Sequence, residues 1–503
     1  MPAGEGLGTL DRMSSRSPSQ PVTGALRAIA VIAGVAITVA APAPRGEEAR
    51  AEVVAPQHRP HPPLAYLPAP PAVGEMPAVS AIVDGAVAAR RLPGAVVQVG
   101  HGGEVVFRRA YGARKLAGEP GLDGLPTAAE PMTTDTVFDV ASLTKVLATS
   151  TAVMQLDEKG LIGLDDPVQA HLPEFNPAGD PLRARVTLRM LLTHTSGEPG
   201  DVNLDDAWGL ARSDPAEGTR RALTAPLESP PGAGFRYSDI NYLLLGEVIE
   251  RMSGETLDGY VQRHVFGPLG MTQSRYLVAG GPLWHNPRLL ARIAPTRHDT
   301  ENARDPVRNP HFGELLRGSV DDPTSRRMGG VAGHAGVFST AHDVGLFAQA
   351  LLDRLAGRAS SFPLSQATLR LMTAPAQPGA SPRQLAEAQR ADHETVWGAG
   401  HSPGHPGTPH YPAVRGQNLR GLGWDIDTGY SLPRGAVFPV GSFGHTGFTG
   451  TSLWIDPASD TYVVVLANVV HAPWGPPISR LAGAVATATA QALGLDRGGP
   501  VTG

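Results

Sequence analysis

The chain has 503 residues, with 60 glycines, 48 prolines and no cysteine. The lack of cysteine excludes disulfides, thiolate metal sites and a cysteine nucleophile, and the net charge of −5 provides no basic field for nucleic acid. Apolar residues make up 41% of the chain, which is enough for a sizeable core. The length allows up to roughly three domains, or one large enzyme domain behind an unstructured N-terminal lead.

An apolar run near the N-terminus predicts export. Residues 28–41 form a 14-residue apolar run after Arg27, which is short for a membrane span and typical of a signal-peptide core. We therefore predict that residues 1–41 are a signal peptide or a retained N-terminal anchor, and that the protein lies in the periplasm or cell envelope or is secreted. Residues 42–77 contain ten prolines and predict an extended, disordered linker.

A folded domain is predicted over residues 78–495, followed by a disordered tail over 496–503. Apolar residues at helical spacing predict a first helix over 79–87. Strands are then expected as two antiparallel pairs at opposite ends of the domain, with a closing amphipathic helix after the second pair. These expected elements are the strand pairs 95–99 with 104–107 and 452–455 with 462–466, and the helix 478–494.

Strands at both ends with helices between them predict one sheet that is assembled from distant segments. A mostly helical lobe is expected as an insertion at roughly 146–330. Two stretches rich in Pro, Gly and His, residues 279–325 and 374–420, predict long loops. Three histidines in the second stretch have a spacing that suits no defined metal site: His401, His405 and His410.

The first motif that can carry chemistry is Ser142-Leu143-Thr144-Lys145, at the expected start of a helix. Only three of the 42 basic residues are lysines, and a lysine, unlike an arginine, can be deprotonated near neutral pH when its pKa is lowered. Spacing of three residues puts Ser142 and Lys145 on one helix face. Serine needs a base to act as a nucleophile, a desolvated lysine can help, and N–H groups at the helix start can stabilise an oxyanion.

Two further motifs follow in the chain. Tyr237-Ser238-Asp239 leads into an expected helix, and His445-Thr446-Gly447 directly precedes the strand at 452–455. In this order, the three motifs resemble the signatures of serine β-lactamases and penicillin-binding proteins: S-x-x-K, Tyr-x-Asn and Lys/His-Thr-Gly. Residues 78–495 resemble the group of class C β-lactamases, D-alanyl-D-alanine carboxypeptidases and family VIII esterases, above all its penicillin-binding protein 4B-like branch.

This resemblance implies an α/β fold, the β-lactamase/DD-peptidase sandwich, with an antiparallel sheet flanked by helices and an inserted helical lobe. It implies a serine hydrolase that forms a covalent acyl-enzyme on an amide or ester of the cell envelope, first of all a D-alanyl-D-alanine carboxypeptidase or endopeptidase. The alternatives are a carboxylesterase or weak β-lactamase, and a non-catalytic wall-binding protein. We expect a monomer with a small-molecule or muropeptide substrate, no metal or organic cofactor, no nucleic acid, and membrane contact only through an N-terminal anchor.

The resemblance also assigns roles to single residues. Ser142 would be the acylated nucleophile, Lys145 would help to deprotonate it, and Tyr237 would shuttle a proton to the leaving group and later activate water. The oxyanion would be bound by the backbone N–H groups of Ser142 and Phe448. Two further residues would lie along the substrate: Thr446 and Gly447.

Two positions depart from the family pattern. Asp239 stands where the β-lactamase pattern has Asn, and an ionised Asp accepts hydrogen bonds but donates none. It is expected to cap the following helix, to contact substrate, or to do both. His445 replaces the usual lysine and, when neutral, is a poorer anchor for a substrate carboxylate. Both changes disfavour efficient β-lactam hydrolysis. Trp424 is expected either in the cleft or in the core, and His194 and His334 as structural hydrogen-bonding residues.

Overall fold

The computed structural model describes residues 75–472 and 478–496. The chain divides into a unit of residues 1–65 and a unit of residues 66–503, and every described residue belongs to the second unit. The predicted export segment, nearly all of the predicted linker and most of the predicted tail therefore lie outside the described residues. Within the described part, no helix combines the length and the apolar character that crossing a membrane requires.

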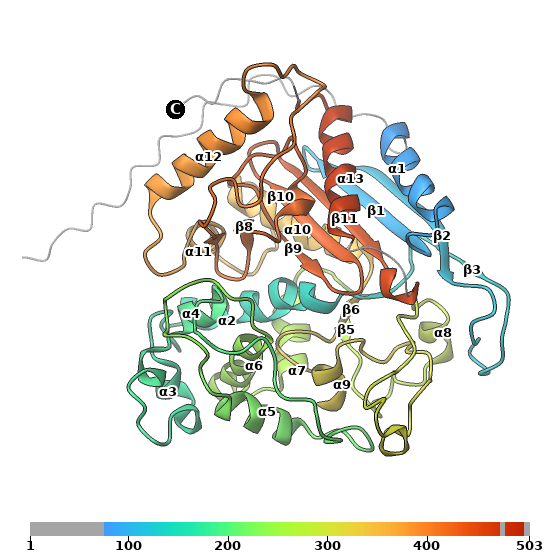
Figure 1. Cartoon of the computed structure of the whole chain (residues 1–503), viewed down its shortest axis with the longest axis vertical. Coiled ribbons are helices and arrows are strands. Elements are labelled where there is room, and N and C mark those ends of the chain that lie inside the picture. Colours follow the sequence, from blue (N-terminus) through green and yellow to red (C-terminus); the bar gives the residue numbers. More distant parts are fainter. Residues whose placement is uncertain (1–74, 473–477, 497–503) are drawn as a thin grey trace, which may run out of the picture. The chain divides into compact units, whose positions relative to one another are not determined.

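An eight-stranded antiparallel sheet is built from both ends of the domain, in the order β3-β2-β1-β11-β10-β9-β8-β7 (Figure 1). β1 pairs with β11 from Ala95 opposite Ala467 to His101 opposite Thr461, which confirms the predicted assembly from distant segments. Both predicted strand pairs are present as β1–β2 and β10–β11. The strands are β1 Gly94–His101, β2 Glu104–Lys115, β3 Glu130–Pro131, β7 Leu419–Arg420, β8 Asp425–Asp427, β9 Phe443–Gly447, β10 Thr451–Asp456 and β11 Thr461–Ala467.

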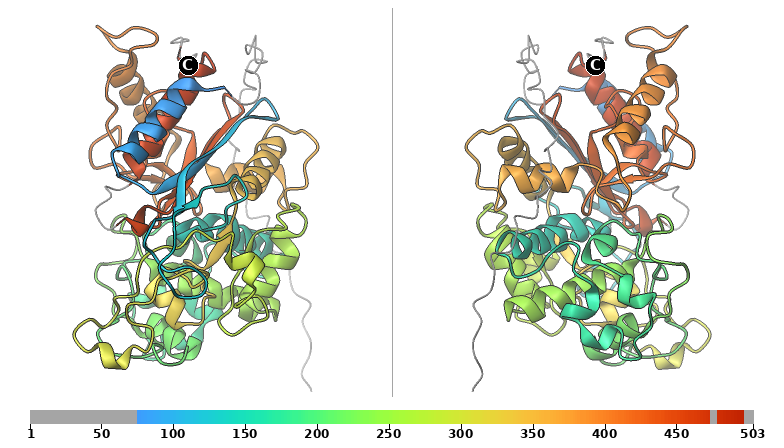
Figure 2. Two further views of the ribbon diagram at one scale, coloured as in Figure 1. Left: turned by 90° about the vertical axis from the view of Figure 1, so that its right-hand side faces the viewer. Right: turned by 90° about the vertical axis from the view of Figure 1, so that its left-hand side faces the viewer.

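Helices cover both faces of this sheet, which explains why all eight residues of β1 are buried. Because side chains alternate along a strand, Val97 and Val99 pack with helices α1 (Pro77–Ala88) and α13 (Ser479–Ala492), whereas Val96 belongs to the core on the opposite face. That second core includes Phe347 of α10 (Ala341–Leu355). Figure 2 shows α1 and α13 on one side of the sheet and α10 on the other.

Between residues 140 and 336, most of the regular elements are helices, joined by irregular stretches. The helices of this segment are α2 Thr151–Glu158, α3 Val168–His171, α4 Leu188–Leu192, α5 Pro215–Thr224, α6 Asp239–Ser253, α7 Leu257–Val261, α8 Pro287–Leu290 and α9 Pro323–Arg327. A small sheet of the order β4-β6-β5 joins them, formed by β4 Phe138–Asp139, β5 Arg275–Tyr276 and β6 Val337–Ser339.

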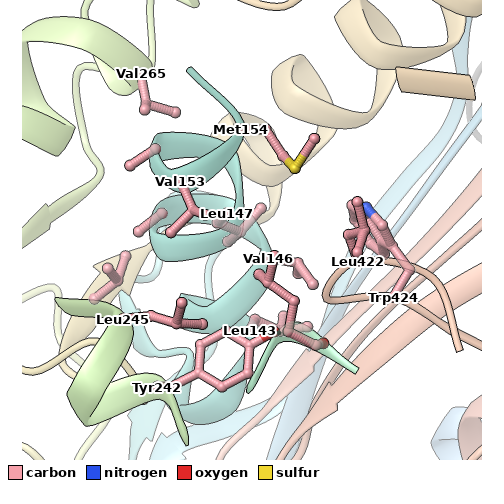
Figure 3. Packing of buried hydrophobic residues seen from close by; sticks show 14 of the residues in the cluster. Leu143, Val146, Leu147, Val153, Met154, Tyr242, Leu245, Val265, Leu422 and Trp424 are labelled. Atoms are coloured by element: carbon pink, nitrogen blue, oxygen red, sulfur yellow. Dashed lines mark hydrogen bonds between the residues drawn. The ribbon is translucent and has the colours of Figure 1, made fainter. Parts of the chain in front are cut away.

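The helical segment that follows Ser142 lies inside one continuous apolar core. Figure 3 shows Leu143, Val146 and Val153 of this segment close to Tyr242 and Leu245 of α6. The same core reaches the sheet through residues around β7 and β8. Burial on several sides fixes the start of this segment relative to both the sheet and α6, and that start carries the S-x-x-K motif.

The prediction of a long loop over 374–420 is wrong, because this stretch contains α12 (Pro382–Trp397), which follows α11 (Gln366–Thr373). Ser381 accepts the N–H of Gln384, whose side chain in turn accepts the N–H of Ser381, and Pro382 occupies the first turn. This capping box was visible in the sequence, but the high Pro, Gly and His content around it obscured the signal. The other stretch, 279–325, is mostly irregular, as predicted.

Candidate active site

Ser142 lies in a tight turn that is held in an uncommon backbone conformation. The 3-10 turn Ala141–Leu143 continues into the π-helical turn Lys145–Ser150 and then into α2. Ala141 has φ +46°, in the left-handed region that non-glycine residues rarely adopt. The carboxylate of Asp139 accepts the N–H of Ala141 at 2.9 Å. Such local strain persists only where surrounding contacts enforce it, and it concentrates at functional sites.

Lys145 is fully buried, and its ammonium group is surrounded by oxygens. Nζ lies 3.0 Å from Ser142 Oγ, 3.0 Å from the carbonyl oxygen of His334 and 2.6 Å from Asp239 Oδ1. Burial lowers the pKa of Lys145, but the Asp239 carboxylate and Tyr237 raise it, and the net shift is upward. The expectation of a lowered lysine pKa is therefore wrong, because the sequence did not reveal the carboxylate contact.

Asp239 is the first residue of α6, and it does not cap this helix. The cap is Ser238, which has an extended backbone and whose side chain accepts the N–H of Asn241. The carboxylate of Asp239 instead forms the ion pair with Lys145. The capping prediction for Asp239 is thus wrong by one residue, and contact of Asp239 with substrate stays a prediction.

Tyr237 faces the ammonium group of Lys145, with 5.0 Å between Nζ and the ring centroid. The Tyr237 ring also stacks on His194, at a centroid distance of 4.4 Å. Burial raises the pKa of Tyr237, and the opposing effects of Lys145 and of a hydrogen bond with Ser142 do not cancel this shift, so the phenol is neutral. His194 Nδ1 accepts the N–H of Ser238 at 3.1 Å, which confirms His194 as a structural hydrogen-bonding residue.

The turn after β9 is fixed directly against the nucleophile segment. A Cβ at Gly447 would overlap the carbonyl oxygen of Val140, so only glycine fits this close approach. The hydroxyl of Thr451 donates to the same carbonyl oxygen at 2.9 Å. These contacts bring the backbone at Phe448 next to the turn of Ser142. The Phe448 ring is 69% exposed.

His445 is buried, and the structure indicates a neutral ring. Nδ1 lies 2.8 Å from the carbonyl oxygen of Thr446 and must carry the proton of this contact, because a carbonyl can only accept. Nε2 is buried without a hydrogen-bond partner among the described residues. Burial lowers the pKa of His445 well below its usual value, and the positive charges of Arg420 and Lys145 add to this effect. His445 therefore offers no cation to a substrate carboxylate.

Two arginines that the sequence analysis did not single out lie near this cluster, and both are paired. Arg420 is buried and forms an ion pair with Asp425 at 3.4 Å. Arg297 forms two hydrogen bonds with the carboxylate of Asp321, and its guanidinium lies 5.2 Å from the centre of the Phe448 ring. Both arginines are separated from the motifs in sequence, so spacing alone could not identify them.

A buried ion pair supports Lys145 from the side of the helical lobe. His334 Nε2 lies 2.8 Å from Asp322 Oδ1, and the His334 carbonyl oxygen accepts from Lys145. Burial alone would lower the pKa of His334, but the Asp322 carboxylate outweighs burial, and the net pKa of His334 is raised. Burial alone would raise the pKa of Asp322, but His334 outweighs burial, and the net pKa of Asp322 is lowered. The sequence marked His334 as structural, but no motif connects it to Asp322.

Other candidates from the sequence lie away from the cluster. Trp424 is fully buried and packs edge-to-face on Phe443 at 5.1 Å, which places it in the core (Figure 3). The side chains of His401, His405 and His410 are exposed. Within residues 75–472 and 478–496, no group of three or more His, Asp or Glu side chains is arranged to hold a metal ion.

Known proteins resemble this chain over most of its length. The family model described as Beta-lactamase matches residues 79–487. A putative D-alanyl-D-alanine carboxypeptidase of Escherichia coli (strain K12) is 30% identical over 394 residues, which cover 74% of this chain and 78% of the relative. A protein of the same name from Salmonella enteritidis is also 30% identical, over 73% of this chain and 77% of its own length.

Solved structures show the same fold. The LovD9 mutant of simvastatin synthase from Aspergillus terreus has a TM-score of 0.55 and 27% identity, and the match covers 82% of this chain and 97% of that protein. The penicillin-binding protein homologue from Pyrococcus abyssi has a TM-score of 0.52 and 22% identity, over 80% of this chain and 75% of that one. These findings confirm the α/β fold and the resemblance drawn from the three motifs. The chain belongs to the Beta-lactamase family and has the fold of its serine hydrolases.

Proposed function

We propose that the protein hydrolyses an amide or ester through a covalent acyl-enzyme on Ser142. The observation that carries this proposal is the 3.0 Å contact between Ser142 Oγ and Lys145 Nζ, in a strained turn that Gly447 and Thr451 fix against β9. A nucleophile in hydrogen-bond contact with a group that can move a proton is the arrangement that covalent catalysis needs.

In the proposed reaction, Ser142 Oγ attacks the substrate carbonyl carbon and its proton leaves along the contact with Lys145. The carbonyl oxygen becomes an oxyanion next to the backbone N–H groups of Ser142 and Phe448. Collapse of this intermediate breaks the bond to the leaving group, which takes up a proton, with the neutral Tyr237 hydroxyl as the nearby shuttle. Water then attacks the acyl-enzyme, releases the acid and returns a proton to Ser142.

We propose a D-alanyl peptide of the cell envelope as the first substrate class. The names of the relatives support this proposal, and so does the free edge of β9. β10 pairs with one side of β9 along its whole length. On the other side, β8 pairs with β9 only where Asp425 lies opposite Gly444, so the stretch from His445 to Gly447 has no strand partner on that side among the described residues. An extended peptide can add to such an edge through main-chain hydrogen bonds. This substrate agrees with the proposed export of the chain.

Ester hydrolysis is the second candidate, and the charges around the site favour it. Arg420 and Arg297 are paired with carboxylates, His445 is neutral, and Lys145 is paired with Asp239. A substrate with a free carboxylate therefore meets no unpaired cation from these groups. Ester substrates need none.

Labelling with a fluorophosphonate, followed by mass mapping of the adduct, tests the proposal. The adduct is expected on Ser142, and Ser142→Ala should lose both labelling and turnover. An adduct on Ser196 or Ser238 would contradict the assignment, and labelling without turnover of any ester, D-Ala-D-Ala peptide or nitrocefin would favour a non-catalytic binding protein. The ratio of peptide to p-nitrophenyl ester turnover decides between the two substrate classes.

A further inference from the structure

We infer that Asp239 takes up, through Lys145, the proton that leaves Ser142 during acylation. This inference rests on the proposed function and assigns a role in proton transfer to the residue that departs from the family's Tyr-x-Asn pattern. An Asn at this position has no site of comparable basicity, whereas a carboxylate can accept a proton and return it.

The contacts of Lys145 carry this inference. Nζ has three oxygen partners, Ser142 Oγ, Asp239 Oδ1 and the carbonyl oxygen of His334, at 3.0, 2.6 and 3.0 Å. The ammonium group donates hydrogen bonds to the serine and to the carbonyl, and it lies in ion-pair contact with Asp239 Oδ1, which has no hydrogen bond of its own among the described residues. A neutral amine could serve all three groups by donating to two oxygens and accepting the serine proton, but the 2.6 Å contact with a carboxylate favours the ammonium, which has no lone pair. Lys145 therefore has to release a proton before or while it accepts one from Ser142.

The partners of Lys145 differ in whether they can take that proton. The carbonyl oxygen of His334 cannot hold it, because a protonated amide is far too acidic. Asp239 Oδ1 can hold it, and at 2.6 Å it forms the shortest of the three contacts. The path from Ser142 Oγ through Nζ to Oδ1 thus ends on a carboxylate.

The step balances in protons and charge. While Ser142 Oγ forms its bond to the carbonyl carbon, its proton moves to Nζ and another Nζ proton moves to Asp239 Oδ1. Lys145 remains an ammonium, Asp239 becomes a neutral acid, and the negative charge moves to the substrate oxyanion. When the bond to the leaving group breaks, the proton returns from Asp239 through Lys145 to that group, with the Tyr237 hydroxyl as the nearby shuttle. Water follows the same route in deacylation, and its proton ends on Ser142.

Every element packed against Lys145 and Asp239 carries titratable or charged groups, and most of these groups keep a single protonation state. Burial keeps the tyrosines in the neutral form, because it raises the pKa of Tyr237 and raises the pKa of Tyr242 to about 12. Burial also lowers the pKa of His194. The groups are Tyr237 before α6, Tyr242 in α6, His194 after α4, Asp201 in the next loop, Asp322 at the start of α9, His334 before β6, His445 in β9 and Arg420 in β7.

Among these groups, Asp201 is the other carboxylate that could be considered as the acceptor of the Ser142 proton. Burial and Asp322 raise the pKa of Asp201 to about 7. Its oxygens accept from the hydroxyl of Thr324 at 3.1 Å and from the N–H of Val202, and not from Lys145. Asp201 is therefore a matched control for the loss of one buried carboxylate beside the site.

The test is the pH dependence of kcat/KM for a p-nitrophenyl ester, measured for the wild type and for Asp239→Asn. If Asp239 accepts the proton, the wild type should lose activity on an acid limb only and stay level through neutral pH. Asp239→Asn should lose about 10²–10⁴-fold at pH 7, the range of a general base. Asp201→Asn should stay within about threefold and keep the wild-type limb, and Asp239→Glu should recover part of the activity with that limb.

If neutral Lys145 is instead the only base, the change in activity caused by Asp239→Asn has the opposite sign. Removal of Asp239 would then lower the pKa of Lys145, and activity at pH 7 would stay unchanged or rise. That result, or a wild-type acid limb above about pH 8, would overturn the inference. Melting temperatures show whether each variant is folded. If Ser142→Ala retains activity, the proposed function fails; if Ser142→Ala is inactive while Asp239→Asn matches the wild type, only the inference fails.

Discussion

Lys145 and Lys115 are both fully buried, and both present an ammonium group to three oxygens. Lys115 Nζ donates to the carbonyl oxygens of Leu116, Glu119 and Ala128, each at 3.0 Å, and so closes the loop between β2 and β3. All partners of Lys115 are backbone carbonyls, which cannot exchange a proton. Lys145 has one carbonyl partner, one hydroxyl and one carboxylate.

The number of contacts therefore does not separate a structural lysine from a functional one. The two lysines have similar burial and similar distances to their partners. Only the partners of Lys145 include groups that can release and accept a proton. The chemistry of the surrounding oxygens, more than the lysine itself, therefore indicates where a reaction can take place.

The largest expected effect comes from replacing each buried lysine by arginine. Lys145→Arg should reduce kcat/KM by about 10²–10⁴-fold, because a guanidinium does not release a proton in any accessible pH range. Lys115→Arg, assayed below its melting temperature, should retain kcat/KM within about threefold. Steady-state kinetics on one ester substrate compare the two variants. Equal losses in both would remove the distinction between a functional and a structural lysine.

Lys115→Met tests the structural side of the comparison. The methionine keeps most of the buried volume but provides no donors, and water can reach the loop carbonyls once the loop opens. The expected cost in the free energy of unfolding is therefore about 2–3 kcal/mol, close to one hydrogen bond to a charged group. Urea unfolding measures this loss, and limited proteolysis should show new cleavage within 116–131. A variant as stable and as resistant as the wild type would contradict the role of Lys115.

The support of Lys145 by Asp322 and His334 should give stability a pH window. The raised pKa of His334 contributes stability below about pH 6.5 that is lost as the pH rises through the folded-state value. The lowered pKa of Asp322 contributes stability above about pH 4 that is lost as the pH falls. Asp322→Asn should therefore be most destabilised, relative to the wild type, between about pH 4 and 6.5, with a variation on the order of 1 kcal/mol.

Thermal unfolding of both proteins across pH 3–9, about the range of these two groups, measures that window. A difference between wild type and Asp322→Asn that does not change with pH would show that the pair does not change its charge on unfolding.

The remaining lysine should give the smallest effect. Lys159 is exposed, and its Nζ contacts only the hydroxyl of Tyr260, at 3.2 Å, among hydrogen bonds of the described residues. Lys159→Arg should change the free energy of unfolding by less than about 0.5 kcal/mol and leave kcat/KM unchanged. A larger change in either measurement would mean that Lys159 is required as a lysine, as Lys115 and Lys145 are expected to be.

Local patterns predicted the parts of the fold that depend on neighbours in sequence. Short runs rich in valine identified β1 and β11, and the three-residue spacing of Ser142 and Lys145 predicted their contact. The direction of the Asp239 carboxylate could not be predicted, because Ser238 competes for the cap and Lys145 lies far away in sequence. The pairing of Asp322 with His334 depends on how a loop folds back, for which the chain carries no periodic signal.

The pairing of β1 with β11 has a consequence for the order in which the chain becomes functional during synthesis. The ribosome makes Ser142, Lys145 and Asp239 long before it makes β11, yet β11 separates β1 from β10 in the sheet. Until that strand emerges, the turn at Gly447 has no complete sheet to hold it against the serine. A nascent chain that ends before residue 461 therefore contains each residue proposed to react and still lacks the scaffold that aligns them. Activity should appear only as the last strand and α13 are added.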